Sequence, residues 1–382
     1  MMEHNSLAAQ YCLDVIRAVM QEQSVPSMPE GVTLGDLFEF SRLHGIEAIV
    51  YHGLSQLDVD EAEPTWASWG LRAEMLLTQS IVQLADRDAL FEALGAANIP
   101  HMPVKGCWLK ESYPQIDFRQ MADLDVLIHN EDRARAKALM LSMGYSEDEE
   151  QGLHHDGYTK APYTAVELHF TLIRSDSEYY PYYKNVWDKA KSVEGHTLLH
   201  RLAAEDEYIF YFVHLKKHMD EAGCGIRTVM DCTVYRRTYP DMDRSYLQGE
   251  FEKLGLSRFV QEVETLADCW FVNGEPLPPG LSRMGEEILW AGMYGSMENY
   301  FRQQMEGLRA RYKNPLLRMA VYWLRKVFRP LWYMKHYYPI LDKYPLLLPF
   351  TWLARIVQKC MESPAALVYQ IKQIYKEGAK DA

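Results

Sequence analysis

The spacing of hydrophobic and polar positions changes twice along the chain. Residues 1–98 place apolar side chains at helical intervals, as in TLGDLFEFSRLHG (33–45), which starts with a threonine cap and ends on glycine. Residues 99–200 contain short apolar runs of strand length, and from 201 to 382 the helical interval returns. The pattern therefore predicts an N-terminal helical region, an α/β core and a C-terminal helical region.

The central region alternates strand and helix signals. Strands are expected in IPHMPV (99–104), DLDVLI (123–128), HHDGYTKA (154–161) and YTAVELHF (163–170). A helix is expected over residues 130–145, which begins with acidic residues and ends near a glycine. Short strands set between helical regions favour a compact mixed sheet, so the predicted fold class is α+β.

Composition narrows the class of protein. The 382 residues are 48% hydrophobic and 24% charged, which is typical of a folded globular chain. A net charge of −13 argues against bulk attraction to nucleic acid or to an acidic membrane. The six cysteines form no CxxC pair, the first residues lack a basic leader, and no apolar run is long enough to cross a bilayer. These features predict a cytoplasmic protein without a transmembrane segment.

Two aspartates stand one residue apart inside a run that otherwise reads as a buried strand. In RQMADLDVLI (119–128), Asp123 and Asp125 flank Leu124 and would project from the same face, ~7 Å apart. Like charges held this close raise the energy of the fold unless a cation lies between them. The spacing therefore predicts a divalent metal site.

A third carboxylate lies on a later strand. Glu167 in VELHF shares its strand face with His169, because side chains alternate with a period of two. Three carboxylates on neighbouring strands can hold two Mg²⁺ ions ~4 Å apart, the separation used for in-line phosphoryl or nucleotidyl displacement. Oxygen ligands favour Mg²⁺, with Mn²⁺ as the second choice.

Phosphate-binding groups precede this acidic strand. Gly106 sits at an expected strand-to-helix turn, where backbone N–H groups and the helix N-terminus attract an anion. Lys105 adds a point charge, and Arg119 has the forked geometry that suits phosphate oxygens. Each feature alone has a simpler explanation, such as a solvated strand edge or an ordinary turn, but their combined order along the chain is more specific.

The order of a glycine turn, a strand with two acids and a later strand carboxylate resembles the polymerase-β-like nucleotidyltransferase superfamily. The stretch IPHMPVKGCWLKESYPQIDFRQMADLDVLI, followed by VELHFTL, is similar more closely to the uncharacterised nucleotidyltransferases of that superfamily. The resemblance implies that Asp123, Asp125 and Glu167 are catalytic metal ligands and that Gly106 forms the phosphate turn. The wider superfamily usually has Ser or Gly after this glycine, whereas this chain has Cys107.

The resemblance implies a magnesium-dependent enzyme that moves an NMP from an NTP, with ATP as the first choice, to a hydroxyl or phosphate acceptor. One alternative is toxin-like transfer to a protein or tRNA. The other is a nucleotide-binding protein that has lost turnover, which Cys107 favours and the complete set of carboxylates opposes.

Two features of the C-terminal region complete the prediction. His218 lies on an expected helix directly after the core and is assigned to the nucleotide pocket together with Asp231. Residues 302–335 hold nine Lys or Arg and one acid, Glu306, between aromatic side chains. Such a stretch can bind nucleic acid or lie on an anionic membrane, but the favoured interpretation is a helix pair with its rings in the core.

Overall fold

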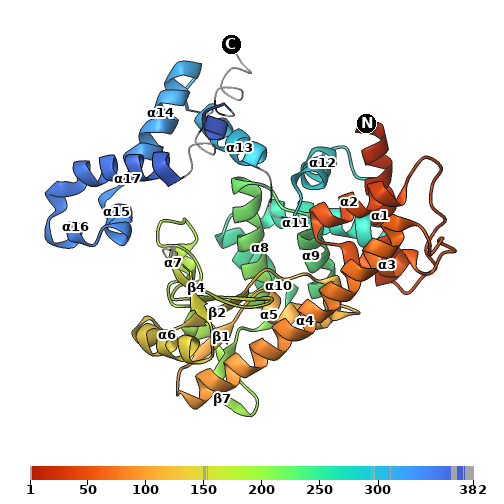
Figure 1. The fold of residues 1–382 in the computed structure, drawn as a ribbon, viewed down its shortest axis with the longest axis horizontal. Coiled ribbons are helices and arrows are strands. Elements are labelled where there is room, and N and C mark those ends of the chain that lie inside the picture. The colour runs from red at the N-terminus through yellow and green to blue at the C-terminus, as the bar shows by residue number, and fades with distance from the viewer. Residues whose placement is uncertain are drawn as a thin grey trace. The chain divides into compact units, whose positions relative to one another are not determined.

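The computed structural model describes residues 2–148, 152, 154–293, 295, 297–309, 311–362, 368–372 and 374. The chain forms two compact units, both drawn in Figure 1. Unit 1 comprises Met1–Lys217 and Cys224–Met293, and unit 2 comprises His218–Gly223 and Tyr294–Ala382.

Unit 1 combines one sheet with helices that precede and follow it in the chain. Its helices are α1 (Met2–Met20), α2 (Leu34–His44), α3 (Glu47–Leu54), α4 (Pro64–Ala96), α5 (Gly106–Leu109), α6 (Arg133–Ser142), α7 (Tyr180–Tyr183), α8 (Ala204–Glu221, whose last turn belongs to unit 2), α9 (Ile226–Thr238), α10 (Arg244–Lys253), α11 (Ser257–Asp268) and α12 (Ser282–Ala291). Its strands are β1 (His101–Pro103), β2 (Leu124–Ile128), β3 (Ser146–Glu147), β4 (His155–Lys160), β5 (Thr164–His169), β6 (Lys191–Val193) and β7 (His196–Arg201).

The seven strands form one mixed sheet in the order β3-β4-β5-β2-β1-β7-β6. Strand β2 runs parallel to β5, and β1 runs parallel to β7, whereas the other neighbouring pairs are antiparallel. In the β2–β5 register, Asp125 lies opposite Glu167, and in the β4–β5 register, His155 lies opposite His169. Directly opposed residues share a face of the sheet, so these four side chains are placed on one side.

The other face of the sheet is apolar and packs against helices α4 and α6, which lie beside the strands in Figure 1. The core at this face includes Leu124, Val126 and Ile128 of β2, Val166 and Leu168 of β5, Leu90 and Leu94 of α4, and Met140 of α6. Side chains that alternate along β2 and β5 thus give the sheet one apolar and one polar face, as expected for strands with a period of two.

Polar contacts join the helices before the sheet to the helices after it in unit 1. Helix α2 starts at a capping box between Thr33 and Asp36, and a left-handed Gly45 ends it. His44 accepts the backbone N–H of Ile226, and its other ring nitrogen lies 3.1 Å from the carbonyl oxygen of Leu289. The N-terminal helices and the segment after the sheet therefore fold as parts of the same unit.

Unit 2 is helical where it is described. It contains α13 (Met297–Arg309), α14 (Pro315–Val327), α15 (Leu331–Tyr337), α16 (Ile340–Lys343) and α17 (Leu348–Glu362). Its small core gathers Phe301, Met305, Leu308, Tyr322 and Ile374. Among the described residues of the whole chain, none of the helices combines the length and the hydropathy that a bilayer crossing needs.

The predicted α+β fold is confirmed, with strands where four of the apolar runs place them. The sequence pattern did not predict the two-residue strand β3 at one edge of the sheet, nor β6 and β7 at the other edge. The segment of β6 and β7, KSVEGHTLLHR, is largely exposed and polar, so it lacks the apolar alternation that marked the other strands. The predicted regions 1–98, 99–200 and 201–382 were defined by where helix and strand patterns occur along the chain. The two compact units are defined by which residues contact one another, so the two divisions describe different properties.

Candidate active site

Asp125 is the buried centre of the polar face. It is the second residue of β2, is 4% exposed, and its Oδ1 atom accepts hydrogen bonds from Lys105 Nζ and His169 Nε2, each at 2.7 Å. Burial alone would raise the pKa of this carboxyl, but Lys105 and His169 overcome that effect and hold it well below its usual range. Asp125 is therefore ionised at neutral pH.

Glu167 projects beside Asp125 from the neighbouring strand. Its Oε2 atom lies 3.2 Å from His169 Nε2 and 3.5 Å from His155 Nδ1. Burial of the imidazole alone would lower the pKa of His169, yet its bonds to Asp125 and Glu167 raise it. One imidazole thus links both carboxylates, as the predicted shared face of Glu167 and His169 requires.

Asp123 behaves differently from Asp125. It stands one residue before β2, is half-buried, and has its pKa raised to about 6 by burial and by the charge of Asp125, although Lys105 partly offsets both effects. The repulsion expected between the two aspartates is therefore present, and it raises the pKa of Asp123.

The side chains of this face offer two groups of potential metal ligands. In the first, ligand atoms of Asp125, Glu167 and His169 all lie within 4.8 Å of one another, and in the second the same holds for His154, His155 and His169. Carboxylate oxygens suit Mg²⁺ and Mn²⁺, and the charge on Asp123, which Lys105 offsets only in part, favours a cation nearby. The residues present therefore fit a divalent ion, held by the carboxylates.

Lys105 reaches Asp125 from a strained turn. Its backbone has φ 54° and ψ −121°, a left-handed conformation that a side-chain-bearing residue rarely adopts. Lys105 lies between β1, which ends at Pro103, and helix α5, which begins at Gly106. The turn is thus held in a geometry that brings the Lys105 ammonium to the acidic strand.

Gly106 is packed tightly against Arg119. A Cβ atom at Gly106 would lie only 2.4 Å from Arg119 Nη1, so the position excludes a side chain. The Arg119 guanidinium is buried and binds Asp231 of α9 in a bidentate manner, with Nε–Oδ1 at 2.8 Å and Nη2–Oδ2 at 2.9 Å. Tyr113 also donates to Asp231, at 2.6 Å. The structure therefore gives the Arg119 fork a carboxylate of the chain itself as its partner.

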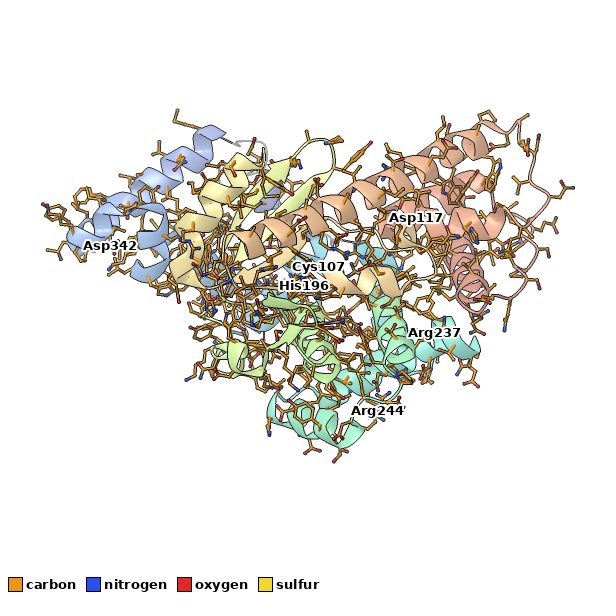
Figure 2. All side chains as sticks on the ribbon, turned by 90° about the horizontal axis from the view of Figure 1, so that it is seen from below. Cys107, Asp117, His196, Arg237, Arg244 and Asp342 are labelled. Carbon is orange, nitrogen blue, oxygen red and sulfur yellow. The ribbon has the colours of Figure 1, made fainter. Side chains whose placement is uncertain are left out.

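Cys107, labelled in Figure 2, is fully buried in the core that lies against α4 and α6. Its thiol lies 3.5 Å from the backbone oxygen of Asp125, and burial raises its pKa to about 12. Its own carbonyl accepts a 2.7 Å hydrogen bond from Arg87 of α4. The side chain after the turn glycine thus fills the core and fixes β2.

Three site residues escaped the sequence prediction. The sequence pattern placed His154 and His155 in an expected strand and gave them no part in the site, yet both are half-buried, and the rings of His155 and His154 lie 5.1 and 5.3 Å from that of His169. Burial and the other two histidines lower the pKa of His154 to about 3. Tyr113 is the third, and only the pairing of distant segments shows its bond to Asp231.

His218 and one surface hollow stand apart from this description. His218 belongs to the last turn of α8, which groups with unit 2, so its assignment to the nucleotide stays a prediction. The hollow has a volume of about 400 Å³ and is lined by Val19, His52 and Phe118 among others. None of the carboxylates above lines it.

Comparison with known proteins gives one match. The family model described as uncharacterised nucleotidyltransferase matches residues 31–272, more than half of the chain. Neither a curated protein nor a solved structure shows significant similarity to the chain.

Replacing Gly106 with alanine tests the tight turn. We expect Gly106→Ala to lower the free energy of unfolding by about 1–3 kcal/mol, because the new Cβ displaces the buried Arg119 guanidinium. Gly249→Ala is the matched control, since a Cβ added to Gly249 in helix α10 would meet no atom within 4 Å, and alanine there keeps or raises stability. Chemical denaturation measures both, and equal effects would refute the packing argument.

The Arg119–Asp231 pair gives a second prediction. Asp231→Asn leaves a buried guanidinium without its counter-ion and should cost about 3–5 kcal/mol of stability. Glu262→Gln, which breaks the exposed pair with Arg258, should change stability little. A small loss in Asp231→Asn, measured by denaturant unfolding, would contradict a structural role for the buried pair.

The two aspartates should have opposite effects on stability without metal. Asp125 has a depressed pKa, so it stabilises the fold above its unfolded pKa, and Asp125→Asn should lower stability at pH 7. Asp123 has a raised pKa of about 6, so its charge destabilises the fold above pH 6 and this cost fades as pH falls toward 4. Asp123→Asn should therefore raise stability at pH 7 and flatten the pH profile between 4 and 6. Thermal unfolding in chelator checks both signs, and a fall in both variants contradicts the assigned repulsion.

Proposed function

The chain belongs to the family of uncharacterised nucleotidyltransferases, and from that premise we propose that it transfers an NMP from an NTP to an acceptor hydroxyl or phosphate. In this reaction an acceptor oxygen bonds to the α-phosphorus while the bond from that phosphorus to the bridging oxygen breaks. Pyrophosphate leaves with the electron pair of the broken bond. ATP is the donor we propose first.

One observation carries the proposal, namely the in-register pair of carboxylates on one sheet face. Asp125 and Glu167 lie opposite each other on parallel strands, with Asp123 just ahead of them. We assign Mg²⁺, or Mn²⁺ in its place, to these three residues. A divalent ion at this position supplies positive charge for the triphosphate and the leaving pyrophosphate.

The remaining side chains have distinct proposed roles. Glu167 accepts the proton of an acceptor hydroxyl, while His169 holds Asp125 and Glu167 at a fixed separation through its single Nε2 atom. Lys105 and the N–H groups at Gly106 bind the triphosphate. His218 is proposed as a further nucleotide contact on the strength of its sequence position alone.

Arg119 is proposed as a positioning residue. Its Nε and Nη2 atoms are engaged by Asp231, and its Nη1 atom lies against Gly106. This arrangement supports the phosphate turn from behind, so an Arg119 variant would alter nucleotide binding through the shape of the turn. Lys110 reinforces the same segment by donating to the backbone oxygen of Arg119 at 2.7 Å.

A second candidate function is nucleotide binding without turnover. The observation that favours it is that Asp125 Oδ1 already accepts from Lys105 and His169, so the chain supplies its own positive partners for the central carboxylate. In the transferase, Lys105 moves from Asp125 to the triphosphate when nucleotide and metal bind. In the binding protein, Lys105 keeps its place and metal affinity stays weak.

The proposed setting is the cytoplasm, where NTPs and Mg²⁺ are supplied together. Three acceptor classes fit the proposed reaction, namely a small molecule, a protein and a tRNA. Mass spectrometry after incubation with labelled NTP distinguishes these classes, because the mass of the added NMP appears on the acceptor molecule.

Pyrophosphate release tests the proposed transfer. Wild-type protein with Mg²⁺ or Mn²⁺, each of the four NTPs and a cell extract as acceptor source should release pyrophosphate and label one class of molecule. Asp123→Asn combined with Asp125→Asn should reduce release by several orders of magnitude, since both carboxylates of the central strand lose their charge.

Asp176→Asn is the control, because Asp176 is a partly exposed acid beside Arg174 on the surface. It should leave release unchanged. Tight NTP binding by wild-type protein without release under any of these conditions would favour the binding-only candidate, and the absence of both would overturn the two together.

A further inference from the structure

Unit 2 exposes an unusual amount of apolar surface. Among its described side chains, Leu346 is 91% exposed, Met361 79% and Phe350 70%. The same region exposes Leu316, Leu317, Leu324, Phe328, Trp332, Tyr337, Ile340, Tyr344, Leu353, Ile356 and Val357. Extended apolar surface left exposed on a folded unit marks a place where another molecule binds.

Helix α17 shows how this surface is built. Phe350, Leu353, Val357 and Met361 follow one another at intervals of three, four and four residues, which places them on one side of the helix. All four are exposed, whereas the polar Thr351 is buried at 7%. The apolar stripe of α17 therefore faces outward.

Helix α14 repeats this arrangement. Leu317 and Leu324 lie seven residues apart on one side and are exposed, together with Phe328 just after the helix. The cationic Arg318 is buried at 3%. The favoured interpretation of the sequence placed the aromatic rings of residues 302–335 in the core. Tyr322 is buried there as expected, but Phe328 and Trp332 are exposed.

Charge decides among the possible occupants of these stripes. Residues 302–335 carry a net charge of +8 in a chain whose total is −13. Two copies of this segment brought face to face would repel each other, whereas an anionic surface would be attracted. Exposed aromatic side chains such as Trp332, Tyr337 and Tyr344 are the type that settles at the boundary between lipid headgroups and acyl chains.

We propose that helices α14–α17 of unit 2 bind the surface of an anionic lipid bilayer. The apolar stripes of α14 and α17 enter the headgroup region, and the basic residues beside them contact lipid phosphates. With 15 residues, α17 is shorter than the ~20 needed to span a bilayer, so it lies along the surface. These helices lie outside residues 31–272, so the proposal does not depend on the transfer reaction.

Vesicle sedimentation with the full chain tests this proposal. We expect binding to vesicles of equimolar phosphatidylcholine and phosphatidylglycerol, weak binding to phosphatidylcholine alone, and release at high salt. Phe350→Ser with Leu353→Ser should weaken binding at least about tenfold, because two inserted apolar side chains are lost.

Leu71→Ser is the matched control, since Leu71 is 71% exposed on α4 in unit 1, and it should bind as the wild type does. Lys313→Gln with Arg325→Gln removes two exposed cations and should weaken binding to the anionic vesicles by about tenfold or more, with a shallower salt dependence. All three variants need unchanged circular dichroism spectra.

Three outcomes would overturn the proposal. The first is no sedimentation with anionic vesicles at low salt. The second is equal loss of binding in the Leu71 control. The third is a stable dimer in light scattering, or binding to an RNA homopolymer, that the variant Phe350→Ser with Leu353→Ser abolishes while its binding to lipid is unchanged.

Discussion

A buried negative charge in the middle of the sheet organises unit 1. Asp125 is almost fully enclosed on a strand whose neighbouring positions are Leu124 and Val126. A carboxylate in such a place is tolerated only when donors and positive charge surround it. Lys105 comes from the turn after β1 and His169 from the end of β5, so two segments are fixed by the need to meet one side chain. The left-handed backbone of Lys105 is a local cost that this contact offsets.

A second buried pair ties the helices after the sheet to the same turn. Arg119 precedes β2 and Asp231 lies on α9, 112 residues further along the chain, yet they form a bidentate ion pair at the back of Gly106. The turn at Gly106 is therefore shaped by a helix outside the sheet region. This contact gives a physical reason why the family match, over residues 31–272, continues past the strands to include α9.

The two units differ in the way they treat apolar and charged groups. In unit 1, alternation along β2 and β5 sends apolar side chains to α4 and α6 and acids to the other face. In unit 2, the stripes of α14 and α17 stay exposed while Arg318 and Thr351 are buried. The first arrangement gives the usual core of a folded domain. The second leaves the unit with hydrophobic burial still to gain, which is the physical basis of a binding surface.

The sequence by itself determined the α+β class, four of the seven strands and the shared strand face of Glu167 and His169, because periods of 2.0 and 3.6 residues are local properties of the backbone. It also indicated the glycine turn, since the order of Lys105, Gly106 and the acidic strand is local. Only the tertiary structure decided which cation meets which acid. Arg119 binds Asp231, Lys105 binds Asp125, and His154 and His155 join His169, and each pairing depends on strand register and helix packing between segments far apart in the chain. Charge complementarity has no sequence period, so side chains that attract one another at about 3 Å leave no trace in the spacing of residues along the chain.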